Sequence, residues 1–290
     1  RPTVKEDEIE YEHVHIPRDV SIDEFDPSEG VIDSGDAECL NCGVVTEKDT
    51  LKELFSNDKF EFEVCGVRYE SKNSNGSGFR AATKEDKTAI KEAQNQIEND
   101  LRLSTLLSIE RDIGSTDSIR VSWSYLYGME EWRDVYSPRQ LLAHATYLEG
   151  FEKVKPKIKE QYDEERAEAI LVLLTLVSSK ITNRNSRLCP IDVRQRGGGA
   201  PNSMLGTNNF AFQWQFGETN ITTGAYSYQT TLDNIIDHYE EVVGYFDHNN
   251  LAPSTVRQGD AASLPLEDNS VESVIIDPPY GDNIRYAELA

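Results

Sequence analysis

The segment at residues 274–280, which reads VIIDPPY, constrains the fold of this chain more than any other stretch. Its first three residues are β-branched and apolar, which predicts a strand that is buried on both faces, as in a parallel sheet. Two prolines follow, and because proline has no N–H to donate to a neighbouring strand, the strand must end before them. We therefore expect Asp277 and Tyr280 just beyond the carboxyl edge of a sheet, where open α/β folds bind ligands.

The residues before this segment fit the same arrangement. Residues 256–273 predict a short strand, a Gly-Asp-Ala turn that contains Asp260 and Ala261, a Leu-Pro-Leu step and an acidic turn that leads into the next strand. A connection between two ordinary strands would account for them as well. An aspartate cap on a Pro-Pro turn would likewise account for residues 277–280 taken alone.

Together the two segments resemble the D-P-P-Y amino methyltransferases, which methylate an exocyclic nitrogen of adenine or cytosine in DNA. The resemblance implies that the Asp277 carboxylate and the Pro278 carbonyl accept the two N–H groups of the target amine. Pro278 and Pro279 would fix the backbone so that the Pro278 carbonyl points at the target amine before the base binds, and no further backbone entropy is lost on binding. Tyr280 would stack on a base taken out of the double helix.

The same resemblance implies a cofactor, S-adenosylmethionine. Asp260 and the Ala261 backbone would hold its adenine, and Asp277 would lie on the same side of the cofactor. A helix expected at about residues 229–246 would lead into the strand near Val256, as the crossover helix of a Rossmann-type fold does.

Net charge raises an objection to a DNA-binding function. The chain has 52 acidic and 29 basic residues, for a net charge of −23, and such a surface repels nucleic acid at low salt. Either the protein does not bind nucleic acid, or it comes from a high-salt cytoplasm, where charges are screened within about 3 Å at 1 M salt. We favour a halophilic, haloarchaeal source, with DNA contacts confined to a local basic patch.

The cysteines predict a half-site for zinc. Cys39 and Cys42 flank a tight turn, as in a zinc knuckle, and Cys65 is the remaining nearby thiol, so these three are the candidate ligands. A vestigial ribbon without metal is the alternative. Four cysteines in 290 residues are too few for a disulfide framework, and the sequence shows neither a signal peptide nor an apolar run of membrane-spanning length. We therefore expect a cytoplasmic protein without a membrane partner.

Local signals predict the other elements. A hairpin is expected within residues 60–82, and helices are expected to begin after Thr83, which caps a helix to about Leu103, after Ser137 with Pro138 at its first position, and at Asp163. The apolar stripes of the later helices predict core packing.

One loop is basic within this acidic chain. It carries Arg184, Arg187, Arg194 and Arg196 together with a run of glycines. Arginines can bind phosphates, and glycines let a loop follow a groove, so these four predict a nucleic-acid contact surface. Alternating aromatic residues at 210–216 then predict a strand.

The order of all these motifs resembles the large prokaryotic adenine-specific DNA methylases that carry a zinc-ribbon insertion. The motifs that carry the resemblance are residues 39–43 (CLNCG), 127–142, 184–189 (RNSRLC), 259–280 and 282–289. The resemblance implies an α/β fold with a partial Rossmann-like methyltransferase sheet at the C-terminus, an inserted β-rich ribbon-like region and a helical middle. The corresponding regions are residues 229–290, 1–82 and 83–228, and Asn283 and Tyr286 join the residues expected at the DNA.

The implied reaction is methyl transfer to adenine N6 in DNA, because Asp-Pro-Pro-Tyr is the form usual among adenine enzymes. Cytosine-N4 or RNA amino methylation is the nearest alternative, and a non-catalytic zinc- and DNA-binding subunit is the rival from another class. Other subunits of a modification or defence system are expected partners. In the family a glycine-rich loop precedes the ribbon, and residues 197–199 (GGG) have the wrong context for it. We therefore expect the chain to be a truncated part of a longer protein and to be inactive alone.

Overall fold

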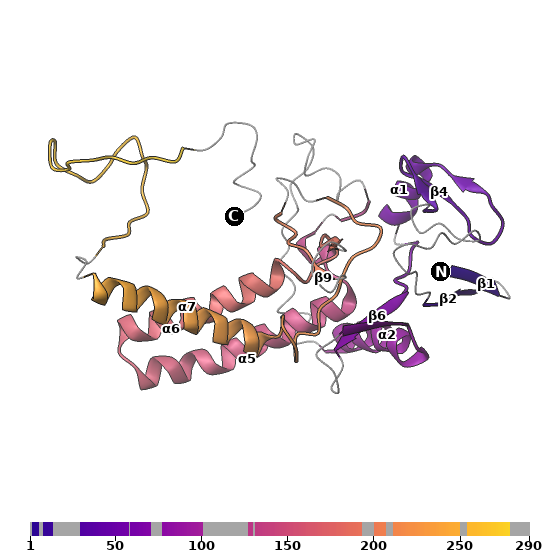
Figure 1. Cartoon of the computed structure of the whole chain (residues 1–290), viewed down its shortest axis with the longest axis horizontal. Helices are drawn as coiled ribbons and strands as arrows, with labels where there is room; N and C mark the ends of the chain where they lie inside the picture. The colour runs from indigo at the N-terminus through magenta and orange to yellow at the C-terminus, as the bar shows by residue number, and fades with distance from the viewer. Residues whose placement is uncertain are drawn as a thin grey trace.

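Three long helices, α5 (Pro138–Gln161), α6 (Glu164–Thr182) and α7 (Tyr228–His248), lie side by side and form the largest regular part of the structure (Figure 1). Helix α6 packs between α5 and α7. This computed structural model describes residues 2–5, 8–13, 30–57, 59–70, 77–100, 127–129, 131–192, 200–206, 211–249 and 254–278. Within these ranges, no helix combines the length and the apolar character that crossing a bilayer requires.

Side-chain caps determine where the three helices begin. At the start of α5 the Ser137 hydroxyl accepts the Gln140 N–H, and the Gln140 side chain accepts the Ser137 N–H at 2.9 Å. Asp163 accepts the Arg166 N–H at 2.9 Å and so opens α6. The predicted starts of both helices are confirmed. The Ser227 hydroxyl caps α7 in the same way, close to the predicted start of that helix.

The N-terminal part consists of small antiparallel sheets and two helices. In chain order these elements are β1 (Pro2–Lys5), β2 (Glu8–Tyr11), β3 (Ile32–Asp33), β4 (Asp36–Glu38), β5 (Val45–Thr46), α1 (Lys48–Ser56), β6 (Gly66–Glu70), β7 (Ser77–Ala81) and α2 (Lys84–Asn99). Strand β1 pairs with β2, β4 pairs with β3 and β5, and β6 pairs with β7. The β6–β7 pair confirms the predicted hairpin.

Helix α2 is tied to the preceding strand by one acidic residue. Asp86 accepts the Thr83 N–H at 2.7 Å in a capping box, and it also accepts hydrogen bonds from both terminal nitrogens of Arg80 in β7. These bonds hold the pKa of Asp86 well below its usual value, with the Arg80 bonds as the largest cause. The cap at Thr83 is as predicted, but α2 ends at Asn99, short of the predicted end at Leu103.

Residues that precede α5 and residues that follow α6 form a small buried core next to the helices. Met129, Val135 and Leu188 are fully buried and pack with four half-buried residues, Trp132, Tyr136, Met204 and Phe212. A short 3-10 helix, η1 (Trp132–Val135), leads into α5. Two short paired strands, β8 (Ile191–Asp192) and β9 (Ala200–Pro201), lie beside this core.

An aromatic cluster joins the N-terminal part to this core. The ring of Phe55 from α1 stacks on Phe60 and meets Tyr127, Phe212 and Trp214 edge to face. Phe212 and Trp214 of the alternating aromatic segment therefore pack in this cluster, and Phe216 meets Phe62 edge to face. The described residues of that segment, 211–216, form no strand, which corrects the prediction for them.

The fold class is mixed α/β, as expected at that level. The sheets of the described residues have two or three antiparallel strands, and residues 254–278 contain no strand. The buried strand predicted at residues 274–276 is thus not formed there: Ile275 is 94% exposed and Ile276 75%. A single strand cannot bury its own faces, and a parallel strand needs paired neighbours and helices on both sides of the sheet. The described part of the chain supplies no such neighbours.

Helix α7 also differs from the expected pattern. The prediction places its apolar stripe in a core, yet Tyr239 and Val242 of that stripe are more than half exposed. Helix α6 packs along α7, α5 meets the start of α7 where Tyr147 stacks on Tyr228, and the extended segment 254–278 runs away from the three helices (Figure 1).

Candidate functional site

The residues expected at the methyl-transfer site lie in the C-terminal extended segment. Asp277 and Pro278 are both exposed at its end. Pro279, Tyr280, Asn283 and Tyr286 lie outside the described residues. The contacts expected between these residues and a target base therefore stay predictions.

The expected cofactor residues form a small turn of their own. The Asp260 side chain accepts the Ala262 N–H at 2.9 Å, and its carbonyl accepts the Ser263 N–H at 3.0 Å. A hydrogen bond from the backbone N–H two residues later to the aspartate side chain is the bond that defines an Asx-turn. Asp260 and Ala261 are exposed, so the turn is a local feature, and the described structure does not join it to Asp277 in a pocket.

Cys39 and Cys42 lie on a tight turn that backbone hydrogen bonds close. The Cys39 N–H donates to the Val44 carbonyl at 2.9 Å, and the Gly43 N–H donates back to the Cys39 carbonyl at 2.8 Å. Gly43 has φ +69°, a left-handed conformation that glycine adopts without strain. Hydrogen bonds from the backbone of Cys42, then from that of Asn41, lower the pKa of the Cys39 thiol. A lowered pKa favours the thiolate, which is the form that binds metal.

The third candidate ligand is not beside this pair. Cys65 is exposed and lies near Tyr11, whose pKa is raised first by burial and then by the charges of Cys65 and Glu63. Across the described ranges, no three His, Cys, Asp or Glu side chains come close enough to hold a metal ion. The described residues thus supply two of the four ligands that a structural zinc needs, and by themselves they do not fit the metal.

Of the four arginines predicted at a nucleic-acid surface, Arg184 is the one that the structure places at a groove. It follows the end of α6, and one of its terminal nitrogens donates to the Pro201 carbonyl at 3.3 Å. Its guanidinium carbon lies 5.5 Å from the centre of the Tyr226 ring. Arg194 and Arg196 lie outside the described residues.

Arg187 lies inside the protein, which removes it from the predicted DNA surface. It is 6% exposed, and one of its terminal nitrogens donates to the Asp134 carbonyl at 2.6 Å. Its guanidinium also stacks on Phe60 and Phe62 from the N-terminal part. Burial lowers the pKa of Arg187 to about 10. The sequence pattern predicts a phosphate ligand at this position, and that prediction is wrong. The burial of Arg187 depends on aromatic residues more than 120 positions earlier in the chain, which a local pattern does not show.

The loop that carries both arginines is organised by buried amides. The Asn185 side-chain carbonyl accepts the Thr219 N–H at 3.0 Å and faces the Gln140 amide at 3.5 Å. The Asn185 backbone carbonyl accepts the Nε2–H of His144 at 3.2 Å. Burial lowers the pKa of His144. The sequence patterns did not reveal that Asn185 connects these segments. The polar run at residues 183–186, between two apolar helices, was a usable signal, because buried amides need several hydrogen-bond partners.

A second buried contact fastens the loop after β9 to the start of α5. Glu218 accepts the Ser137 hydroxyl and, at 2.8 Å, the Nε–H of Arg139. A half-buried pair of this kind is less screened than a surface pair. The cap of α5 therefore also sets the path of residues 211–220.

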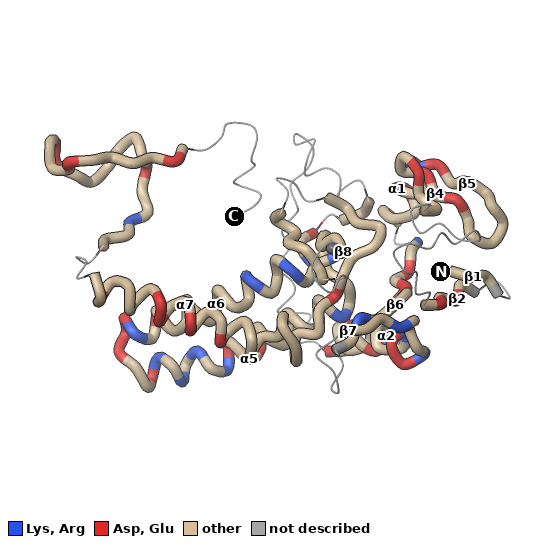
Figure 2. Tube along the Cα trace, viewed as in Figure 1, with Lys and Arg blue, Asp and Glu red and all other residues tan. Residues whose placement is uncertain are grey.

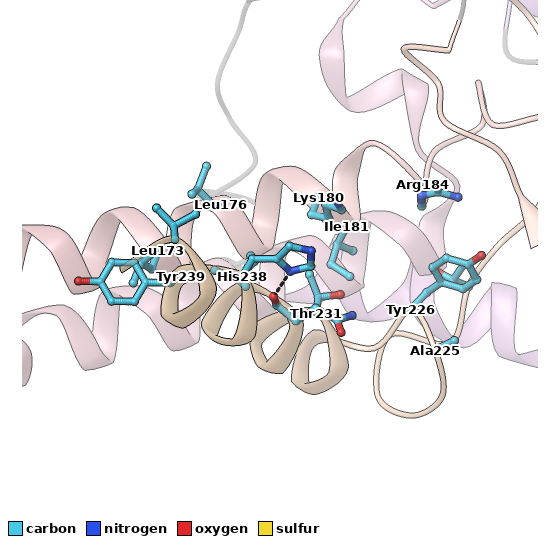
Figure 3. A pocket seen from close by; sticks show the side chains of 14 residues that line it. Leu173, Leu176, Lys180, Ile181, Arg184, Ala225, Tyr226, Thr231, His238 and Tyr239 are labelled. Carbon is cyan, nitrogen blue, oxygen red and sulfur yellow. Dashed lines mark hydrogen bonds between the residues drawn. The ribbon is translucent and has the colours of Figure 1, made fainter. Parts of the chain in front are cut away.

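A groove of about 580 Å³ runs between α6 and α7. Figure 3 shows Leu173, Leu176 and Tyr239 towards one end and Arg184 and Tyr226 towards the other. The rest of the lining consists of Lys180, Ile181, Thr219, Ala225, Thr231, Asn234, Ile235, His238 and Val242. A second, apolar groove of about 410 Å³ lies between α5, α6 and the start of α7, where the Tyr147 and Tyr228 rings stack at 4.3 Å.

Electrostatics distinguishes the α6–α7 groove from the rest of this acidic chain. Lys180, Arg184 and His238 contribute nitrogen-bearing side chains to its lining, which contains no aspartate or glutamate among the described residues. The basic residues of the groove, Lys180 and Arg184, lie at and just beyond the C-terminal end of α6, whereas the glutamates of α6 lie in its first turns; Figure 2 shows acidic residues along α7. The groove is therefore the described cavity that suits an anionic ligand.

Comparison with known proteins assigns no family to this chain: no family model, no curated protein and no solved structure matches it.

Proposed function

We propose that this chain belongs to an enzyme that transfers a methyl group from S-adenosylmethionine to the N6 of adenine in DNA. The observation that carries the proposal is the apolar run at residues 274–276, which is largely exposed and ends directly in Asp277 and Pro278. Exposed β-branched runs of this kind are rare on a soluble protein and mark a surface that another element covers.

A Rossmann-like sheet is the arrangement that would cover this run. Helix α7 precedes the run and has its own exposed apolar face, with Val242 54% exposed. In a Rossmann-type unit a helix packs on the sheet that its neighbouring strands form, so the helix and the strand bury each other's apolar faces. The Asp260 turn lies between them, at the position where such a unit passes from one strand to the next. These features support the sheet as part of the proposal.

Each residue has a role that follows from its chemistry. S-adenosylmethionine would supply the electrophilic methyl group. The Asp277 carboxylate and the Pro278 carbonyl accept the N–H groups of the target amine and orient its lone pair. Pro279 fixes the backbone, and Tyr280 stacks on the flipped base. Asp260 and the Ala261 backbone contact the adenine of the cofactor.

The test is methyl transfer by the full-length gene product from labelled S-adenosylmethionine to DNA. Asp277→Ala should abolish transfer while cofactor affinity changes only a few-fold, because Asp277 serves the target amine. Asp260→Ala should instead raise the KM for the cofactor. Asp268→Ala, which changes an exposed acid in the same segment, is the matched control and should leave both parameters unchanged.

Product analysis decides between related reactions. N6-methyladenine in the digested DNA supports the proposal. N4-methylcytosine would make the protein a cytosine enzyme, and label in RNA alone would make it an RNA methyltransferase. Wild-type transfer by Asp277→Ala, or no cofactor binding by the full-length protein, would refute the catalytic assignment and leave a zinc- and DNA-binding subunit as the interpretation.

A further inference from the structure

One side of the groove between α6 and α7 is cationic, and its described lining contains no acidic residue. Lys180 lies in the last turn of α6 and Arg184 lies just beyond its end, and both line the groove. Within the described residues, no carboxylate forms an ion pair with either side chain. In a chain with a net charge of −23, two neighbouring cations in a lining that contains no aspartate or glutamate among the described residues give this groove a local positive charge.

The opposite side of the groove adds a histidine with a defined orientation. His238 donates its Nδ1–H to the Asn234 carbonyl one turn earlier in α7. Its other ring nitrogen, Nε2, is thereby left available to a ligand (Figure 3). The acidic residues of α7 are not part of the groove lining; they are Asp233, Asp237, Glu240, Glu241 and Asp247.

Aromatic and polar groups complete the lining. The rings of Tyr226 and Tyr239 lie towards the two ends of the groove, with Thr231 between them (Figure 3). The buried hydroxyl of Thr219, also in the lining, has no hydrogen-bond partner in the described structure.

We propose that the α6–α7 groove binds the backbone of single-stranded DNA, with phosphates on Lys180 and Arg184 and bases or sugars against the tyrosines and leucines. Grooves for single strands combine a row of cations with aromatic platforms, and this groove has both. The inference rests on the proposed function, because a methyltransferase that flips a base must hold the strand beside it.

The test is DNA binding by the 290-residue chain, because the described groove is formed within it. A fluorescently labelled oligonucleotide is titrated, and anisotropy is measured at several salt concentrations. Lys180→Gln/Arg184→Gln should weaken binding by about tenfold or more. The slope of log K against log salt should also fall by about 0.7 for each phosphate that the variant no longer neutralises. Lys180→Glu/Arg184→Glu should weaken binding further.

The matched control changes two lysines outside the groove. Lys157 and Lys159 are exposed on α5, so Lys157→Gln/Lys159→Gln removes the same charge but should keep the wild-type slope and most of the affinity. Circular dichroism and the Tm of every variant establish that it is folded. If a groove variant unfolds, Lys180→Gln alone, at an exposed position, carries the test.

Three results would overturn the inference. The first is a groove variant that binds DNA like the wild type, and the second is equal weakening in the control. The third is competition by polyglutamate as strong as by DNA, which would assign the groove to an acidic protein partner. These outcomes leave the methyl-transfer test at Asp277 intact, whereas absence of methyl transfer by the full-length wild type would refute the proposed function without touching the measured groove affinity.

Discussion

The guanidinium carbon of Arg187 lies 4.9 Å from the centre of the Phe62 ring and 5.3 Å from that of Phe60. One of its terminal nitrogens also donates to the Asp134 carbonyl at 2.6 Å. The cation thereby joins the N-terminal part to the loop before α5. A desolvated guanidinium over an aromatic face contributes about 2 kcal/mol, so this contact carries a measurable share of the stability of the junction.

The first prediction concerns this junction. Arg187→Met keeps the apolar stem but removes the stacking charge and the hydrogen bond to Asp134, so the free energy of unfolding should fall by about 2–4 kcal/mol. Urea unfolding followed by tryptophan fluorescence measures the change.

The contrast with Arg184 makes this prediction specific. Arg184→Met should cost less stability than Arg187→Met, because the Arg184 side chain is only half-buried and makes one long hydrogen bond and one contact with the Tyr226 ring, and it should weaken DNA binding. Equal loss of stability in both variants, or a DNA defect confined to Arg187→Met, would contradict the internal role of Arg187.

The second prediction is a pH dependence that originates at His144. Burial lowers the pKa of this imidazole in the folded state. Its Nε2–H donates to the Asn185 carbonyl, and its Nδ1 faces the Tyr228 hydroxyl at 3.5 Å and the Tyr136 ring at a centroid distance of 4.9 Å. No carboxylate or second cation is among these described neighbours, so the neutral imidazole is the form that fits.

The sign follows from the protons bound in each state. Below about pH 6.5 the unfolded chain protonates this histidine, whereas the folded protein does so only at lower pH. The stability that comes from a neutral His144 is therefore fully present above about pH 6.5, and it is lost as the pH falls towards the lowered pKa of the folded state. The urea midpoint of the wild type should drop between pH 7.5 and 5 more than that of His144→Gln, which keeps a donor. Parallel pH profiles for the two proteins would contradict the prediction.

Residues whose signals are local were the ones that the sequence predicted well. Ser137 and Asp163 cap their helices as expected, because a cap is a bond between a side chain and a backbone N–H three residues later. The β6–β7 hairpin is local in the same sense. The position of Arg187 could not be predicted in this way, since its partners Phe60 and Phe62 come from a distant segment.

The failure at residues 274–276 has another physical origin. The β-branched run predicts burial, but burial of a strand depends on neighbours that the run itself cannot specify. The contacts of Asn185 were missed for a related reason. Gln140, His144 and Thr219 all hydrogen-bond to this one residue, although nothing in the sequence pairs them. Of the candidate site, the sequence located Arg184 but gave no indication of Lys180 and His238 in the same groove.

The third prediction concerns metal. Cys39 and Cys42 form a turn with a lowered Cys39 pKa, whereas Cys65 lies beside Tyr11. If the protein contains zinc when it is prepared without chelators and under reducing conditions, Cys39→Ser should remove it and Cys65→Ser should leave it. Elemental analysis of the purified proteins measures the zinc. Loss of zinc in both variants would place Cys65 in the metal site, against the described geometry.

The last prediction uses the exposed apolar run as a probe of what covers it. Ile275 is 94% exposed in this chain, and exposed β-branched segments promote association. In the 290-residue chain, Ile275→Lys should therefore reduce self-association, which sedimentation velocity measures over a range of protein concentrations. Ser273→Lys adds the same charge two residues away, at an exposed polar position, and should reduce association less.

The same substitution should have the opposite consequence in the full-length gene product. If residues 274–276 are a central strand there, as the methyltransferase proposal requires, a lysine at position 275 would be buried without a partner, which costs several kcal/mol. Ile275→Lys should then lower the Tm strongly and abolish methyl transfer, whereas Ile275→Val should retain both, since it keeps an apolar β-branched side chain. A full-length Ile275→Lys protein with wild-type Tm would mean that the run stays exposed, and that the sheet, and with it the position of Asp277 at a strand end, must be abandoned.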